Sequence, residues 1–161
     1  YRLDYGTESP IGRQTIQMAL TPEVFCQDLA PARTFILQQE AEWLRQQGLG
    51  QRVTCHDLLV FDDAGPVDNP LRCEDECVRH KALDLVGDLA LAGCDIHGHI
   101  VAFRSGHRLN ADLVRALLAE GQVVEDIRRI ACERPTRDAA SADAHVPHGH
   151  RSRTGEFGPW Q

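Results

Sequence analysis

Residues 74–91 carry the strongest structural signal in the sequence, an amphipathic pattern that ends two residues before Gly93. Apolar residues occupy one side of a helical projection, and polar residues occupy the other. The pattern predicts a helix of about five turns that packs one face on the core and ends at the glycine. The apolar residues of this face are Val78, Ala82, Leu85, Val86, Leu89 and Ala90.

His80, Asp84 and Asp88 follow one another at four-residue intervals on the polar side of this helix. They form one stripe, with Lys81 at its margin. A histidine and a carboxylate on adjacent turns can hold one metal ion, and zinc accepts both donors. A catalytic zinc site needs a third protein ligand and an open position for water. An ordinary solvated helix face explains the same spacing.

A second metal hypothesis uses Cys73, Cys77, His80 and Asp84, which fall on the same stripe. Thiolates are good zinc ligands, so a closed structural site is conceivable. One straight helix cannot wrap four ligands around one ion, however, and two is the practical limit. The cysteines are widely spaced overall, which favours reduced and mostly buried thiols over disulfides. They are Cys26, Cys55, Cys73, Cys77, Cys94 and Cys132.

His107 lies in a second candidate segment, directly after the Ser105-Gly106 turn that follows a predicted strand at 98–104. A histidine on a tight turn can project into a cleft, and imidazole ordinarily titrates near neutral pH. Asp88 is a suitable carboxylate partner if the long helix packs beside this turn. A plain surface histidine is the alternative.

The remaining elements mix strands and helices, which predicts an α+β fold, a two-layer domain with a mostly antiparallel or mixed sheet packed on helices. Strands are expected at 1–5, 15–20, 33–37 and 58–61. Helices are expected from the N-cap Thr21 to about residue 30, at 38–47 and, after the N-cap Asn110, at 111–120. The helix at 38–47 is expected to turn Ala41, Trp43 and Leu44 inward. Residues 62–70 are expected to form a turn-rich loop, and 123–131 fit either a strand or a helix.

The composition changes near residue 133, so a folded domain is expected over 1–132 and a disordered tail over 133–161. His145, His148 and His150 in this tail could bind a metal weakly, although a solvated low-complexity end explains them better. The net charge of −7 argues against non-specific binding to nucleic acid. No apolar run is long enough to span a bilayer, so a cytoplasmic protein without a transmembrane segment is expected.

Several motifs together closely resemble the UDP-3-O-acyl-N-acetylglucosamine deacetylase family. The main ones are LRCEDECVRHKALDLVGDLALAG at 71–93 and GHIVAFRSGHRLNADLVRALL at 98–118, supported by IGRQ at 11–14, APARTF at 30–35 and WLRQQGL at 43–49. The resemblance covers roughly residues 1–119 and implies the second, C-terminal domain of a zinc amidohydrolase of lipid A synthesis. Its substrate is a UDP-linked acylated glucosamine.

The resemblance also implies a role for each matching position. His80 and Asp84 match zinc ligands, and Lys81 and Phe35 match residues that hold the substrate. The other matches are catalytic: His107 as acid and oxyanion stabiliser, Asp88 as the carboxylate that orients it, and Thr34 beside the oxyanion. Residues 35–60 match the insert that builds the acyl-chain passage.

Two departures from the family pattern matter. The N-terminal domain of the family supplies the third zinc ligand, a histidine preceded by the glutamate that acts as general base, and this sequence has no Glu-His pair. We therefore expect a fragment that is inactive without that domain as its partner. A non-catalytic relative that binds a metal or a partner is the alternative. Cys73 and Cys77 stand where the family usually has aromatic residues.

Overall fold

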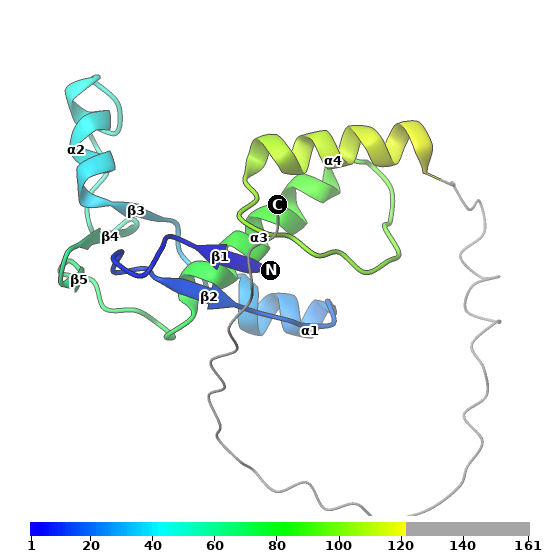
Figure 1. The fold of residues 1–161 in the computed structure, drawn as a ribbon, viewed down its shortest axis with the longest axis horizontal. Helices are drawn as coiled ribbons and strands as arrows, with labels where there is room; N and C mark the ends of the chain where they lie inside the picture. Colours follow the sequence, from blue (N-terminus) through cyan, green and yellow to red (C-terminus); the bar gives the residue numbers. More distant parts are fainter. Residues whose placement is uncertain (122–161) are drawn as a thin grey trace, which may run out of the picture. The chain divides into compact units, whose positions relative to one another are not determined.

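The computed structural model describes residues 1–121, which group as one unit. They contain four α-helices, one π-helical turn and two small sheets, so the α+β prediction is confirmed (Figure 1). The predictions for 123–131 and for the tail at 133–161, including its three histidines, lie outside the described residues. The predicted domain end at residue 132 lies outside them as well.

Helix α3, Glu76–Ala90, is the longest helix of the described part and lies beside β1, Arg2–Asp4, β2, Arg13–Thr15, and α4, His107–Glu120 (Figure 1). It packs against the sheet formed by β1 and β2, against the π-helical turn at Phe25–Leu29 and against helix α4. Val78, Ala82 and Leu89 are buried on its apolar face, as the periodicity predicted, and Leu85 and Val86 are half-buried. The prediction is wrong for Ala90, which is exposed at the last residue of the helix. This packing leaves the edge that carries His80, Asp84 and Asp88 only partly covered.

The first sheet pairs β1, Arg2–Asp4, with β2, Arg13–Thr15, in antiparallel register. Leu3 of β1 is buried in the main core. The predicted strand at 15–20 is wrong beyond its first residue. Ile16 N–H still bonds the carbonyl of Tyr1 at 3.0 Å, but no strand of the described part lies opposite the following residues. The remaining members of the core cluster are Ile11, Phe35, Leu59, Phe61, Cys77 and Val78.

The second sheet has the order β3-β4-β5, with β3, Phe35–Leu37, parallel to β4, Leu59–Asp62. Strand β5, Gly65–Pro66, returns antiparallel to β4 inside the segment that was expected to be a loop. This sheet and β4 in particular hold Thr34 in place, because Leu59 N–H bonds the Thr34 carbonyl at 2.8 Å.

Helix α2, Gln38–Gln46, connects β3 to the β4 segment, and its bounds agree with the prediction. The inward orientation of Trp43 is wrong, because its side chain is 59% exposed. Ala41 and Leu44, which lie three residues apart on one face, are half-buried. Trp43 projects about 200° away from Ala41 around the helix, so the face that packs on β3 and β4 excludes it.

Helix α1, Pro22–Val24, begins as predicted. Thr21 is the N-cap, its Oγ1 accepts a hydrogen bond from Val24 N–H at 3.2 Å, and Pro22 is the first helical residue. The helix continues as the π-helical turn η1, Phe25–Leu29. This turn packs on α3 and buries Leu29 completely.

Residues 98–104 do not form the predicted strand. They make one isolated bridge, in which Arg2 N–H bonds the Ala102 carbonyl at 2.8 Å and Arg104 N–H bonds the Arg2 carbonyl at 3.0 Å. Strand β1 is only three residues long, so its free edge offers too little backbone for a longer ladder. The short bridge nonetheless anchors the segment that leads into α4.

Helix α4, His107–Glu120, starts earlier than predicted, with Gly106 as its N-cap. The prediction of Asn110 as N-cap is wrong: its backbone N–H already makes a helical bond to the Gly106 carbonyl at 3.0 Å. Its side chain is buried inside the structure and is used elsewhere, as described below.

The described cysteines are free thiols, and the expectation that most are buried is wrong. Cys77 is buried in the core, Cys26 and Cys94 are exposed, and Cys55 and Cys73 lie between these extremes.

No helix within residues 1–121 combines the length and the apolar character that crossing a membrane requires.

Candidate functional site

Four polar side chains, Glu76, His80, Asp84 and Asp88, recur at every fourth position of α3. Each step of four residues rotates the side chain by about 40° around the helix axis. The stripe therefore drifts from the core towards the surface, and the side-chain exposure rises from 0% through 12% and 15% to 17%. The four groups have different environments as a result, and Glu76 was not among the predicted site residues.

His80 contacts a different partner with each ring nitrogen. Nε2 lies 3.0 Å from Thr34 Oγ1, and Nδ1 lies 3.5 Å from Asp84 Oδ2. The second distance is too long for a good hydrogen bond, and Nδ1 is buried without a hydrogen-bond partner. Burial lowers the pKa of His80 below its usual value, against the opposing effect of the Asp84 carboxylate. A neutral imidazole, the form that binds a metal, is favoured.

The His80–Asp84 pair fits two ligands of one zinc ion. Two donors of a tetrahedral zinc lie about 3.3 Å apart, given bonds of about 2.0–2.1 Å. The observed separation of 3.5 Å is close to this value, and the buried Nδ1 has an unused lone pair or proton on that side. Within residues 1–121 no group of three potential ligands comes together. The closed site with Cys73 and Cys77 is therefore not formed among these residues, and His80 and Asp84 are a pair of candidate ligands without a third.

His107 and Asp88 form a second pair beside the first. His107 Nδ1 lies 3.1 Å from Asp88 Oδ1 and 2.9 Å from Oδ2, at the first residue of α4. A carboxylate can only accept, so Nδ1 carries the proton and Nε2 is left free. The Asp88 Oδ2 atom also accepts a hydrogen bond from Asn110 Nδ2 at 2.8 Å. The 70% exposed imidazole of His107 thus stands at the surface with its ring held from one side.

Lys81 and Phe35 lie against the same stretch of α3. Phe35 meets His80 edge to face, with 6.0 Å between ring centroids, and Lys81 Nζ lies 5.7 Å from the Phe35 centroid. Lys81 Nζ also contacts Asp84 Oδ2 at 3.1 Å. The predicted site residues therefore all come together along α3, from β3, from the preceding residue Thr34 and from the start of α4.

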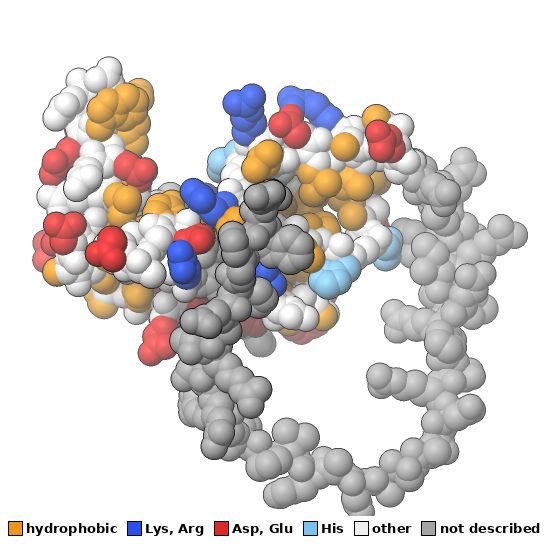
Figure 2. Space-filling view, in the orientation of Figure 1, with side chains coloured by type: hydrophobic (Ala, Val, Ile, Leu, Met, Phe, Trp, Pro, Cys, Tyr) orange, Lys and Arg blue, Asp and Glu red, His pale blue; other side chains and the backbone are white. Residues whose placement is uncertain are grey.

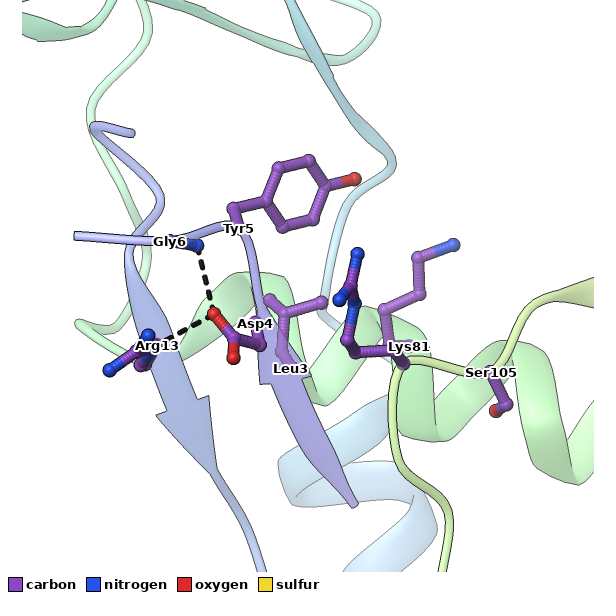
Figure 3. A pocket seen from close by; sticks show the side chains of 8 residues that line it. Leu3, Asp4, Tyr5, Gly6, Arg13, Lys81 and Ser105 are labelled. Atoms are coloured by element: carbon purple, nitrogen blue, oxygen red, sulfur yellow. Dashed lines mark hydrogen bonds and ion pairs between the residues drawn. The ribbon is translucent and has the colours of Figure 1, made fainter. Parts of the chain in front are cut away.

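An open cavity of about 610 Å³ adjoins Lys81 (Figure 3). Residues of β1 and the turn after it form one wall, and Arg104 and Ser105 contribute from the segment before α4. Figure 3 shows Arg13 of β2 tied to Asp4 by a 3.0 Å ion pair, so this cation is already neutralised. Lys81 is itself paired with Asp84 at 3.1 Å, so a bound anion would share Lys81 with this carboxylate, and Arg104 is the second cation of the lining.

Arg33, the residue before Thr34, is joined to Glu76 by a dense set of hydrogen bonds. Its Nε donates to Oε1 at 2.8 Å, its second guanidinium nitrogen to Oε2 at 3.0 Å, and its backbone N–H to Oε1 at 3.1 Å. The backbone N–H of Arg72 adds a fourth bond at 2.7 Å. Burial alone raises the pKa of the Glu76 carboxyl, but these donors outweigh it and hold the pKa below its usual value. The pair places Thr34 next to His80, one helical turn further on.

Large apolar side chains remain exposed on α4 and beside it. Figure 2 shows apolar atoms gathered along α4 and at the far end of α2. Leu109 and Leu118 of α4 are each 58% exposed, and Val101 and Phe103 before the helix are 72% and 59% exposed. Leu109 and Leu118 lie nine residues apart, so they project from opposite sides of α4 and do not form one apolar face.

The profile of the family described as UDP-3-O-acyl N-acetylglycosamine deacetylase (LpxC) matches residues 1–119. The chain belongs to this family. It is 41% identical over 131 residues to the UDP-3-O-acyl-N-acetylglucosamine deacetylase of Solibacter usitatus. This match spans 79% of the present chain and 44% of the relative. The enzyme of the same name from Thermosynechococcus vestitus is 45% identical over 119 residues, 72% of this chain and 41% of the relative. The chain thus spans less than half the length of the curated relatives it matches.

Proposed function

We propose that this chain supplies the C-terminal part of a zinc-dependent deacetylase that hydrolyses the acetamide of UDP-3-O-acyl-N-acetylglucosamine in lipid A synthesis. The observation that carries the proposal is the convergence of Thr34 and His107 on the stripe formed by His80, Asp84 and Asp88. Family membership and the names of the relatives support the substrate and the reaction.

His80 and Asp84 would hold the zinc ion, and the part of the family protein beyond this sequence would complete its ligands and provide the general base. The bound ion would supply Lewis acidity, which polarises the acetamide carbonyl and makes water more acidic. A metal bound at His80 Nδ1 requires the proton to be on Nε2, which then donates to Thr34 Oγ1. The Thr34 hydroxyl hydrogen is thereby free to donate to the oxyanion.

His107 has its Nδ1 proton directed at Asp88, so its Nε2 is the atom that exchanges a proton with the substrate. In the imidazolium form, this Nε2–H stabilises the oxyanion and then protonates the departing amine. Asp88 accepts the Nδ1–H bond and so keeps the ring oriented during this step. Acetate and a free amine are the products.

The substrate is held by groups that surround this centre. Lys81 and Arg104, which line the open cavity, are suited to the diphosphate of a UDP-sugar. Phe35 packs beside His80 and is only 9% exposed, so it would contact the sugar ring or the acyl chain through its uncovered edge alone. The insert at 35–60 would form the acyl passage, and the exposed Val101 and Phe103 before α4 would meet the N-terminal domain.

We place the protein in the cytoplasm, because the cysteines among the described residues are free thiols.

The test is acetate release from UDP-3-O-acyl-N-acetylglucosamine after this chain is joined to the N-terminal domain of a relative such as that of Solibacter usitatus. His80→Ala is the loss-of-function variant. Arg115→Ala, which removes an exposed ion pair to Asp112 on α4, is the matched control. We expect hydrolysis that the control keeps and His80→Ala abolishes. A joined, folded protein that binds the substrate without hydrolysing it would favour the non-catalytic alternative.

A further inference from the structure

Asn110 occupies a position that an asparagine rarely holds without a reason. It lies inside α4, where asparagine is a weaker helix former than at a cap, and only 2% of its surface is exposed. A buried amide is costly unless it is hydrogen-bonded. The partner of Asn110 Nδ2 is Asp88 Oδ2, at 2.8 Å.

The same carboxylate oxygen also receives His107, which lies one turn earlier on the same helix. His107 Nδ1 is 2.9 Å from Asp88 Oδ2 and 3.1 Å from Oδ1. Residues three apart on a helix project from the same face, so both side chains reach one acceptor on α3. The exposed imidazole itself adds little restraint, because 70% of its side chain is in solvent.

We propose that Asn110 is a positioning residue for the Asp88–His107 pair. Its amide fixes the rotation of the Asp88 carboxylate, and the carboxylate then holds the Nδ1–H form of His107 with Nε2 turned outward. The side-chain hydrogen bond of Asn110 goes to Asp88, not to the proposed metal ligands His80 and Asp84. The inference rests on the proposed function only for the catalytic consequence; the positioning itself is a property of this chain.

The first measurement follows the His107 ring in the chain of 161 residues, labelled with ¹⁵N-histidine, by long-range ¹⁵N–¹H NMR. His107→Gln identifies its signals among those of the eight histidines. Asp88→Asn provides the reference for an imidazole that no carboxylate holds. We expect Asn110→Ala to move the His107 nitrogen shifts most of the way to that reference, with loss of Nδ1–H population.

Val114→Ala is the matched control. Val114 is buried one turn further along α4, and its apolar side chain cannot hydrogen-bond to Asp88. It weakens the helix packing but should leave the His107 ring unchanged. If Asn110→Ala does not fold, Asn110→Ser gives the same comparison, since its hydroxyl is too short to span to Asp88. His107 shifts that stay at their wild-type values in the folded Asn110 variant, while Asp88→Asn moves them, overturn the inference.

The second measurement uses the joined, active protein. Asn110→Ala should lower kcat by roughly tenfold and leave KM within about twofold, because only proton transfer is affected. It should add nothing to Asp88→Asn, as expected for residues that act as one unit. Activity in the wild type with an unchanged kcat in Asn110→Ala contradicts the inference alone. An inactive wild type with the NMR response intact contradicts the proposed function alone.

Discussion

Arg33 and Glu76 form a buried salt bridge, with Arg33 Nε 2.8 Å from Glu76 Oε1, one helical turn from the contact of Thr34 with His80. Arg33 and Thr34 are neighbours in the sequence. They contact Glu76 and His80, which lie four residues apart on α3. The first contact is buried and structural, and the second lies at the candidate site. Because the backbone between Arg33 and Thr34 is continuous, the ion pair sets the distance from the Thr34 hydroxyl to His80.

Removing the Glu76 charge should destabilise the chain strongly. Glu76→Gln leaves the Arg33 guanidinium without its carboxylate in a buried site, which typically costs about 3–5 kcal/mol in the free energy of unfolding. Asp75→Asn, at the N-cap of the same helix, is the matched control, since its ion pair with Arg79 is partly exposed and worth less than about 1 kcal/mol. Urea unfolding of the three proteins measures the difference. Equal losses in the two variants would show that the buried pair is not special.

The same carboxylate predicts a pH dependence. The pKa of Glu76 is below its usual value in the folded chain, so the unfolded chain binds the proton more readily. The stability that Glu76 contributes is complete above the ordinary glutamate pKa of about 4.3 and is lost as the pH falls through the lower folded value. Between about pH 5 and pH 3, the wild-type free energy of unfolding should therefore fall more steeply than that of Glu76→Gln. Parallel curves would contradict this assignment.

Cys77 should be chemically inert in the folded chain. Burial raises the pKa of its thiol to about 12, so at pH 8 only on the order of one molecule in 10,000 carries the thiolate. Iodoacetamide should label the exposed Cys26 and Cys94 first and reach Cys77 only after unfolding. Peptide mass spectrometry over a time course gives each rate. Labelling of Cys77 as fast as Cys26 would mean that the core around α3 is open.

The Thr34 hydroxyl should matter for catalysis in the joined protein. Thr34→Val removes a donor to the oxyanion and should lower kcat by about 10²-fold. Thr34→Ser keeps the hydroxyl next to His80 Nε2 and should retain most of the activity. Steady-state kinetics of both variants measure the change in kcat. Equal kcat in Thr34→Val and Thr34→Ser would exclude the Thr34 hydroxyl as a donor to the oxyanion.

The sequence predicted those parts of the site that helix geometry alone determines. Four-residue spacing was enough to align His80, Asp84 and Asp88, because every α-helix has the same periodicity. The placement of Thr34 and Phe35 was inferred only from the family resemblance, since no local pattern brings them to α3. The Arg33–Glu76 pair joins residues 43 positions apart, and the only local signal was that Glu76 extends the four-residue stripe by one step.

The errors have a common origin in tertiary contacts that local patterns do not contain. Asparagine is a common N-cap residue, which led to the prediction for Asn110. In the structure its side chain donates a hydrogen bond to Asp88, and Gly106 is the N-cap of the helix. Residues 98–104 contain the short apolar run of a strand, but they form only one bridge with β1. Trp43 is apolar, yet the face of α2 that packs on the sheet is defined by Ala41 and Leu44.

The central claim is that α3 presents His80 and Asp84 to one zinc ion whose remaining protein ligand lies outside this sequence. Zinc titration by calorimetry of the joined protein, of its His80→Ala and Asp84→Ala variants, and of the chain of 161 residues alone tests it most directly. We predict one tightly bound ion in the joined protein, weak binding in the single chain, and a large loss of affinity in both variants. Unchanged stoichiometric binding in His80→Ala, or equally tight binding by the single chain, would contradict the claim.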